Sequence, residues 1–154
     1  MKALSDISAD ELRHAGYVDE AGVIDLKEPT EMMVTGAKKA EAVTILKRAD
    51  PIAILILQPL SKTLLHSMFM ATGGFFSAGN SEPTRFLRKY LDAKMEKRPL
   101  QAITSTTYSQ HPLLLKWYRF MRYSEPTLEA DGKGHTFVRP PGLKARRAPN
   151  KKPA

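Results

Sequence analysis

Apolar residues recur at helical spacing in two short segments near the N-terminus. Ser8 can cap a predicted helix over residues 9–15, whose first turn holds acidic residues that the helix dipole favours there. Thr30 can cap a second helix over residues 31–40, whose apolar residues roughly follow helical spacing. The segment between them is rich in turn residues and offers one short strand at residues 23–26. Two N-terminal helices are therefore expected before any extended sheet.

Aliphatic and β-branched runs begin at residue 43 and predict a sheet. The runs at residues 43–46 and 52–57 are separated by a short segment that ends in Pro51, which is typical of a hairpin. A turn at residues 59–62 then leads to a third strand over residues 63–71. Consecutive strands joined by such short connections are expected to pair antiparallel.

The second half of the chain alternates between helical and strand patterns. Ser81 or Asn80 can cap the first helix of this half, and Ser109 can cap the second. The predicted elements are a helix over residues 83–97, a strand over 100–107, a helix over 110–121, and two strands over 123–128 and 136–138. The summed order of helices and strands supports a mixed α/β or α+β layer fold.

Four large apolar residues are expected to hold this fold together: Phe86, Leu91, Trp117 and Phe120. Phe86 and Leu91 lie on the apolar stripe of the helix over residues 83–97. Trp117 is flanked by basic residues, as on a surface that stacks nucleic-acid bases. It also shares the leucine stripe of its helix, so packing in the core is the favoured interpretation.

The chain has 154 residues, enough for one domain with a buried core, and it contains no cysteine. Disulfides, thiolate metal sites and cysteine nucleophiles are therefore excluded. The four histidines lack the spacing of a metal site, and no serine or threonine has the partners of a nucleophilic triad at a diagnostic spacing. Neither a metal site nor a catalytic residue is predicted from these patterns.

The formal net charge of +8 is concentrated at the C-terminus. Residues 139–154 hold six cations and no acidic residue, and without these six cations the net charge would be +2. This tail is rich in proline, lysine and arginine, which predicts that it is flexible. Such a tail can bind DNA or an acidic protein surface in a salt-dependent way, or it can simply act as a solubilising terminus. Its predicted contact residues are Lys144, Arg146, Arg147, Lys151 and Lys152.

No apolar run approaches the ~20 residues that span a bilayer. The longest one, residues 52–57, has the length of a buried strand, and the N-terminus lacks the apolar core of a secretion signal. We therefore expect a protein of the cytosol, or one that is packaged from it.

Two stretches near the C-terminus resemble the end of the GNAT (N-acetyltransferase-like) fold. The first is LKW at residues 115–117 with RF at 119–120, and the second is SEPTLEADGKGHTF at 124–137. The resemblance is to a divergent branch carried by short-tailed bacteriophages, the internal virion protein A type. It implies a mixed, mainly antiparallel sheet flanked by helices. The implied division is an N-terminal helix and lead-in at 1–29, a GNAT-like domain at 30–140 and a basic tail at 141–154.

Active members of this family hold the diphosphate of acetyl-CoA on a glycine-rich loop at a helix N-terminus, where N–H groups and the dipole attract anions. The corresponding loop here, residues 77–82, has one glycine where the family has at least two. Glu82 adds a carboxylate, and Pro83 removes one N–H donor. Many members also use a tyrosine of the last helix as general acid. The matching position is Leu115, and Tyr118 lies about 300° around the helix from it.

These departures predict a non-catalytic phage structural protein of the internal virion type, present in the virion or the host cytoplasm and without a cofactor. Its GNAT-like fold would be a scaffold that binds virion proteins or DNA. The alternative is an acetyl-CoA-dependent N-acetyltransferase with an atypical diphosphate loop, whose pantetheine lies near residues 69–71 and 102–104. The cofactor-binding residues of that alternative are Phe69, Met70, Ala71, Gly79, Asn80 and Ser81. A third interpretation is a small nucleic-acid-binding protein that acts through its tail.

Overall fold

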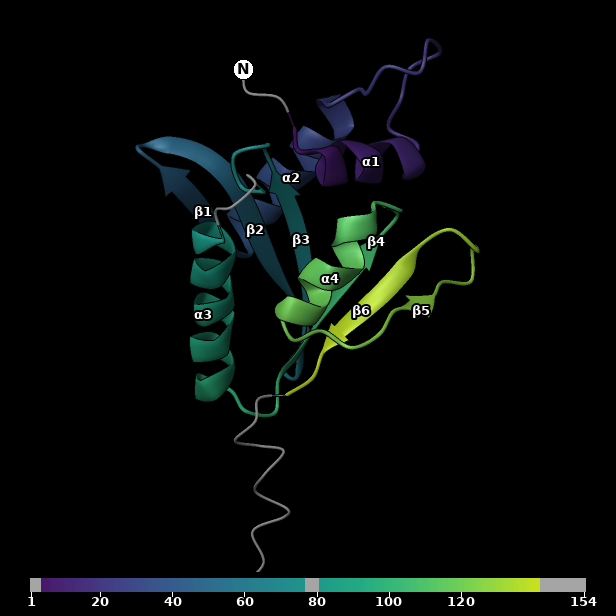
Figure 1. Ribbon diagram of the computed structural model, residues 1–154. Helices are drawn as coiled ribbons and strands as arrows, with labels where there is room; N and C mark the ends of the chain where they lie inside the picture. The colour runs from purple at the N-terminus through teal and green to yellow at the C-terminus, as the bar shows by residue number, and fades with distance from the viewer. Residues whose placement is uncertain (1–3, 77–80, 142–154) are drawn as a thin grey trace, which may run out of the picture.

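Six strands form one mixed sheet at the centre of the molecule (Figure 1). The computed structural model describes residues 4–76 and 81–141. The strand order is β1-β2-β3-β4-β6-β5, in which β3 and β4 are parallel and all other neighbours are antiparallel. The predicted mixed, mainly antiparallel sheet is therefore confirmed. The strands are β1 (Glu41–Lys47), β2 (Asp50–Ser61), β3 (Leu64–Ala71), β4 (Ala102–Thr107), β5 (Thr127–Leu128) and β6 (His135–Arg139).

The predicted hairpin of β1 and β2 is closed by two residues, Arg48 and Ala49. Lys47 pairs with Asp50 across the turn, and the two central residues have φ angles of 51° and 69°. Positive φ at both positions is the requirement of a type I′ turn, whose twist matches that of the strands it joins. Neither residue is glycine, so the turn holds two side chains in a backbone region that sterically disfavours them.

β2 continues to Ser61, with an irregular register between Pro59 and Ser61, so the turn predicted at residues 59–62 falls at 62–63. Pro59 pairs with Leu65 of β3, so the predicted start of the turn is wrong. β1 pairs with β2 only as far as Leu57, and no strand of the described residues pairs with Pro59 on that side. Proline is tolerated there because the N–H that it lacks has no neighbouring strand to bind.

β3 and β4 pair over only three residues and then part. Their last parallel pair is His66 beside Thr104. Beyond it, β3 stays paired with β2 as far as Ala71, and β4 stays paired with β6 as far as Thr107. The C-terminal halves of two neighbouring strands therefore face each other without a ladder between them.

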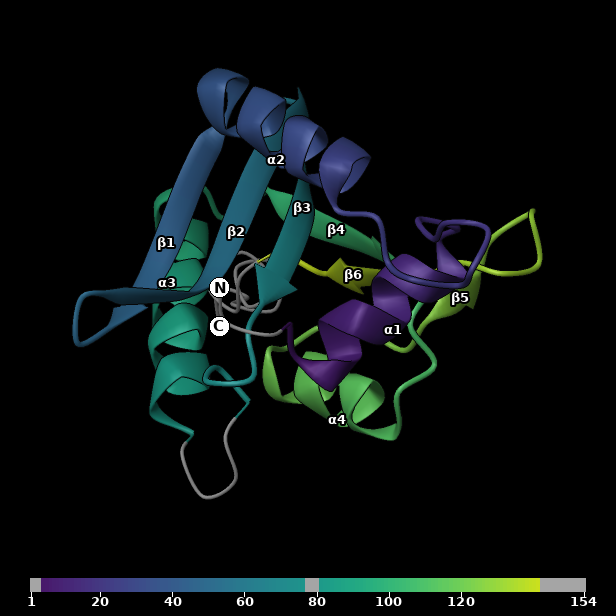
Figure 2. The ribbon, with the colours of Figure 1, turned by 90° about the horizontal axis from the view of Figure 1, so that it is seen from above.

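Helices cover both faces of the sheet (Figure 2). α2 (Lys27–Lys39) lies on one face, where a Cβ on Gly36 would come within 3.0 Å of the Cε of Met68. The glycine that weakens this helix in the sequence therefore lets it approach the sheet closely, since a larger residue would require the Met68 side chain to shift. α3 (Glu82–Lys97) and α4 (Pro112–Phe120) lie on the opposite face. Within the described residues, no helix is long and apolar enough to cross a membrane.

α1 (Asp6–His14) begins three residues before the predicted start at residue 9 and is tied to β3. Its N-cap is Ser5, whose hydroxyl accepts a hydrogen bond from the N–H of Ser8 at 3.1 Å. Ser8, which was the predicted cap, instead accepts a hydrogen bond from the N–H of Ala71 at 3.0 Å. Ile7 of this helix belongs to the hydrophobic core. The division into a lead-in, a domain and a tail stays a prediction, and residues 142–154 lie outside the described part of the chain.

Other predicted boundaries also shift. α2 begins before the predicted cap at Thr30, and no side chain caps it. α4 has His111 rather than Ser109 as its N-cap. Where a strand was predicted at residues 23–26, the structure has one isolated bridge. These segments are turn-rich, so several local conformations compete and packing decides between them.

The face beneath α3 and α4 holds an aromatic core. Trp117 stacks on Phe69 of β3 with ring centroids 5.0 Å apart. Tyr118 stacks on Phe137 of β6 with centroids 4.0 Å apart. Leu91 is 1% exposed and belongs to the core, whereas Trp117 is partly buried and packs against it.

Phe86 and Phe120 do not lie in this core, contrary to prediction. They are 54% and 38% exposed, because each lies at the border of the buried stripe of its helix. The guanidinium of Arg88 lies 4.6 Å from the ring centroid of Phe120. This cation–π contact joins the outer surfaces of α3 and α4.

Candidate functional site

A cleft opens where β3 and β4 part. Its volume is about 390 Å³. Residues 66–70 of β3 and 105–108 at the end of β4 form its walls, and side chains of α1, α2 and α4 complete the lining. α2 and α4 lie on opposite faces of the sheet (Figure 2), and residues of both helices line the cleft, which therefore has one side beneath each helix.

His66 forms the floor of this cleft and is held there by Thr104. Nδ1 of His66 lies 3.2 Å from Oγ1 of Thr104, and that hydroxyl donates to the carbonyl oxygen of Leu65 at 3.3 Å. A hydroxyl has one proton, so Nδ1 of His66 must be the donor in its contact with Thr104. Nε2 of the neutral ring then keeps its lone pair. Burial lowers the pKa of His66, which favours this neutral form at neutral pH.

Tyr118 reaches the cleft from α4. Its hydroxyl lies 2.6 Å from Oγ of Ser105, one residue beyond Thr104. Burial raises the pKa of Tyr118, so the phenol keeps its proton at neutral pH. The sequence placed Tyr118 away from the family position at Leu115 and predicted that it packs or points elsewhere. It does pack, on Phe137, but it also lines the cleft.

Hydroxyl groups hold the two strands together at the point where they part. Oγ of Ser67 donates to the carbonyl oxygen of Thr104 at 3.0 Å. Tyr123 forms a further hydrogen bond with Ser67, and burial raises the pKa of this tyrosine. Side chains therefore replace the missing ladder next to the last parallel pair.

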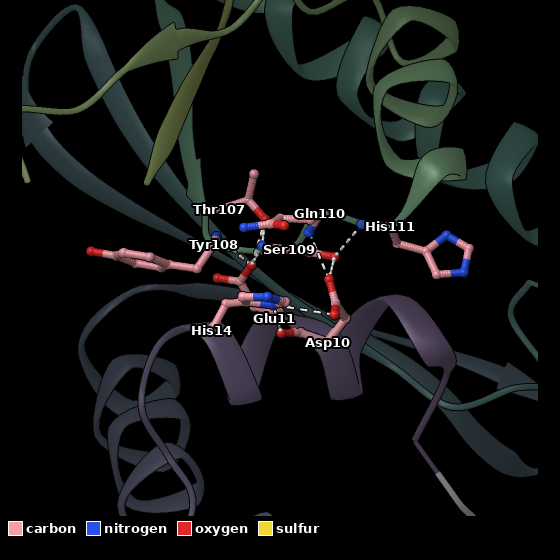
Figure 3. Close-up of polar contacts among 8 residues, drawn as sticks. All are labelled: Asp10, Glu11, His14, Thr107, Tyr108, Ser109, Gln110 and His111. Carbon is pink, nitrogen blue, oxygen red and sulfur yellow. Dashed lines mark hydrogen bonds and ion pairs between the residues drawn. The ribbon is translucent and has the colours of Figure 1, made fainter. Parts of the chain in front are cut away.

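Two adjacent carboxylates of α1 bind the end of β4 and the segment that follows it (Figure 3). Oδ2 of Asp10 accepts hydrogen bonds from Oγ of Ser109 at 2.9 Å and from the N–H of Gln110 at 2.6 Å. Oε2 of Glu11 accepts three hydrogen bonds, at 2.5, 2.6 and 2.7 Å, from the Thr107 hydroxyl and the N–H groups of Tyr108 and Ser109. The helix therefore holds the end of β4 and the segment that leads into α4.

The pKa values of the two carboxyl groups are shifted in opposite directions. Desolvation raises the pKa of Glu11, even though its three donors favour the ionised form. At Asp10 burial acts in the same upward direction, but the hydrogen bonds from Gln110 and Ser109 outweigh it and the pKa is lowered. Sequence reasoning assigned both residues only to the helix dipole. Their partners are far along the chain, 97 residues away for Tyr108, so no local pattern could reveal them.

The edge of β3 that faces the gap carries backbone hydrogen-bonding groups. The N–H of Ala71 donates to Oγ of Ser8 at 3.0 Å, and its carbonyl oxygen accepts from the N–H of Ser5 at 2.9 Å. Both contacts point away from β2. Backbone groups of a strand alternate in direction, so the N–H and C=O of Phe69 point to the same side as those of Ala71. Phe69 therefore presents a strand edge to the cleft that it lines.

The residues predicted to bind a cofactor divide into four groups. Phe69 and Met70 line the cleft, whereas Ala71 is bonded to α1. Ser81 is the N-cap of α3, without a side-chain cap bond. The remaining predicted residues lie outside the described part of the chain: Gly79 and Asn80 of the loop, and Lys144, Arg146, Arg147, Lys151 and Lys152 of the tail. Binding of DNA or virion proteins by the tail stays a prediction.

Within residues 4–76 and 81–141, no group of three or more histidine, aspartate and glutamate side chains could hold a metal ion. The polar groups of the cleft are hydroxyls, one imidazole, one carboxylate and a backbone edge. Such a set suits an organic ligand and proton transfer.

By sequence, no family model and no curated protein matches this chain. By structure, it is similar to a ribosomal-protein alanine N-acetyltransferase from Escherichia coli (TM-score 0.56, 15% identity, 93% of this chain and 96% of that chain). It is also similar to a phosphinothricin acetyltransferase from Sinorhizobium meliloti in complex with acetyl-CoA (TM-score 0.55, 14% identity, 99% and 93%). A third is an N-acetyltransferase from Thermoplasma acidophilum in complex with coenzyme A (TM-score 0.57, 10% identity, 88% and 89%). The fold of this protein is therefore the GNAT fold.

These structures contradict the prediction of a non-catalytic phage structural protein. The neighbours are acetyltransferases, and two of those named above hold acetyl-CoA or coenzyme A. The GNAT resemblance read from the sequence is confirmed at the level of the fold. Its assignment to a phage virion branch has no support in these comparisons.

Proposed function

We propose that this protein is an acetyl-CoA-dependent N-acetyltransferase. The observation that carries the proposal is the parting of β3 and β4 beyond His66 and Thr104, which leaves a cavity of about 390 Å³ between two strand edges. Solved neighbours in complex with acetyl-CoA or coenzyme A support the same function.

The cleft fits the pantetheine arm of the cofactor. That arm is an extended chain with two amides, and an extended chain can add to an exposed strand edge as a further strand would. The backbone of Phe69 supplies such an edge, and the volume is within the ~300–1,000 Å³ of small-molecule sites. Phe69 and Met70 are the described residues proposed to hold the arm, with Ser81 at the start of α3. When bound, acetyl-CoA supplies an acetyl thioester, whose C–S bond breaks as the acceptor nitrogen forms the amide, and coenzyme A leaves as the thiol.

Two side chains of the cleft have the protonation states that this reaction needs. Nε2 of His66 has a lone pair that can accept a proton from the acceptor nitrogen, because Nδ1 donates to Thr104. Tyr118 keeps its proton beside Ser105 and is the proposed proton donor. The two groups come from opposite faces of the sheet, so base and acid are kept apart.

Calorimetric titration with acetyl-CoA, and with coenzyme A for comparison, tests the proposal. We expect micromolar binding, and the absence of binding up to about millimolar concentration would overturn the proposed function. Turnover can be followed as thiol release, because the chain has no cysteine of its own to react with a thiol reagent.

Tyr118→Phe tests the assignment of the acid. It should lower kcat by about 100-fold or more while leaving the affinity for acetyl-CoA unchanged. Tyr90→Phe is the matched control, because it likewise removes a hydrogen-bonded tyrosine hydroxyl, here one bonded to Glu41, but at a residue outside the cleft lining. Equal effects of the two substitutions would refute a catalytic role for Tyr118.

A further inference from the structure

The two sides of the cleft differ in chemistry. Ser67, Ser105 and Tyr118 bring hydroxyl groups to the side that α4 covers. The side that α2 covers is mostly carbon and sulfur, and its polar groups are the imidazole of His66 and the hydroxyls of Tyr17 and Thr106. Its wall consists of Pro29, Met32, Met33, Met68 and Met70.

Methionine makes this wall apolar and adaptable. Its unbranched side chain and polarisable sulfur fit apolar ligands of different shape. The wall is also held in place at one point, since the hydroxyl of Tyr17 donates to Sδ of Met32 at 3.3 Å. Met68 is held against Gly36 of α2. The wall is thus suited to an apolar group of the ligand and can accommodate groups of different shape.

Charged groups in the lining are few, which limits what a ligand can carry. Among the described residues that line the cleft there is no lysine or arginine, so a carboxylate or phosphate on the acceptor would have no cation to pair with. The one acidic residue is Glu11, and one of its carboxylate oxygens already accepts three hydrogen bonds. A second ammonium on the acceptor would therefore have few acceptors in the cleft and would lie against methionine side chains along most of the wall.

We propose that the acceptor is a primary amine carried on an uncharged apolar group. Its nitrogen meets Nε2 of His66 at the floor, and its carbon body packs on the methionines of α2 and β3. This assignment of a substrate class rests on the proposed acetyltransferase function.

Three amines with the same six-carbon chain test the proposal: hexylamine, 1,6-diaminohexane and 6-aminohexanoate. They differ only at the far end, which is a methyl, an ammonium or a carboxylate. We expect kcat/KM for hexylamine to exceed that for each of the others by at least about tenfold. Equal or higher values for the diamine or the amino acid would overturn the proposal and leave acetyl-CoA dependence intact.

Binding without cofactor gives an independent result. Trp117 is the single tryptophan of the chain and lines the cleft, so its fluorescence reports amine binding directly. Hexylamine should change this signal at lower concentration than the other two amines, and the reverse order would overturn the proposal. If acetyl-CoA does not bind, the proposed function fails by calorimetry, and the fluorescence ranking still decides whether the cleft prefers an apolar amine.

Met32→Glu places a carboxylate on the apolar wall. It should raise the preference for 1,6-diaminohexane over hexylamine by about tenfold, because the far ammonium gains a partner. Val34→Glu is the matched control. It adds the same charge to α2 outside the cleft lining, at a residue of similar exposure (49%, against 47% for Met32), and should leave the preference unchanged. Equal shifts in the two variants would mean that the wall does not contact the acceptor.

Discussion

The carboxylate of Glu11 connects α1 to the end of β4, and its removal should weaken the whole domain. In Glu11→Ala, the donors on Thr107, Tyr108 and Ser109 lose their shared acceptor. The N–H of Ser109 keeps a second acceptor in Oγ1 of Thr107 at 3.2 Å, and the Thr107 hydroxyl can rotate. The N–H of Tyr108 is left without an acceptor, so the full free-energy cost of an unsatisfied donor applies to it. At about 1–3 kcal/mol for a buried donor without an acceptor, and a similar amount for the lost charge-assisted bonds, the expected loss is about 3 kcal/mol.

Urea unfolding measures this loss, with the fluorescence of Trp117 as the signal. In a chain of this size, the same loss corresponds to a fall in Tm of about 6–12 °C. Glu31→Ala is the control, because Glu31 is an exposed glutamate of α2 and its removal should change the free energy of unfolding by less than about 0.5 kcal/mol. A Glu11→Ala variant as stable as the control would refute the reasoning about the three hydrogen bonds.

The pH dependence of Glu11 has a definite sign. Burial raises its pKa in the folded protein, so folding favours the protonated acid. The resulting stabilisation is complete below the unfolded-state pKa of about 4.3 and is lost as the pH rises through the raised folded-state value. Glutamine does not titrate, so the stability of the wild type relative to Glu11→Gln should fall as the pH rises from about 4 to 7. A difference that grows over this range would contradict the assignment.

Three further substitutions have clear expected outcomes. Ala49→Gly should raise the free energy of unfolding by about 0.5–1 kcal/mol, because it relieves the positive φ of 69° in the hairpin turn, and a lower Tm would contradict this. Arg139→Met should cost about 2 kcal/mol in urea unfolding, since the buried guanidinium pairs with Asp92 and donates to the carbonyl oxygen of Met121 at 3.0 Å, while Asp92 keeps Arg122 as a partner; an unchanged midpoint would refute the importance of this pair. His66→Gln should slow acetyl transfer and remove the fall in rate that protonation of the wild-type imidazole causes, a fall expected at a pH lower than the ~6.5 of an unperturbed histidine because burial lowers the pKa of His66. A variant with the wild-type pH profile would exclude His66 as the base.

Local patterns predict this fold well where burial alone specifies the structure. The apolar run at residues 52–57 has no polar face to expose, so it forms a central strand as predicted. Pro59 shows where local reasoning stops, because its tolerance depends on β1 ending beside Leu57. Phe86 shows the same limit for helices, since the width of the buried stripe depends on how α3 meets the sheet.

The candidate site is less predictable because its contacts join distant segments. His66 meets Thr104, 38 residues further on, and neither residue has a diagnostic neighbour in sequence. The position of Tyr118 was judged against a family position at Leu115. That comparison indicated that Tyr118 lies on a different face of the helix. It could not show that the phenol is long enough to contact Ser105 on β4.

The diphosphate loop and the cleft should contribute unequally to the affinity for acetyl-CoA, and the two contributions can be measured separately. Pro83 lies in the first turn of α3 and has no N–H to offer an anion, while the strand edge at Phe69 suits the pantetheine arm. Most of the affinity should therefore come from pantetheine. S-acetylpantetheine, which lacks the nucleotide and its diphosphate, should bind within about tenfold of acetyl-CoA, whereas each tenfold gain from a working anion site would represent about 1.4 kcal/mol.

Pro83→Ala separates the two contributions, because it gives the helix N-terminus one more N–H donor. With an anion contact at a helix end worth about 0.3–1 kcal/mol, the variant should bind acetyl-CoA about two- to fivefold more tightly and S-acetylpantetheine with unchanged affinity. Calorimetry with both ligands measures the difference. If the wild type binds acetyl-CoA more than about 100-fold more tightly than S-acetylpantetheine, the diphosphate is held well despite Pro83. The departures of this loop from the family pattern would then carry no functional meaning.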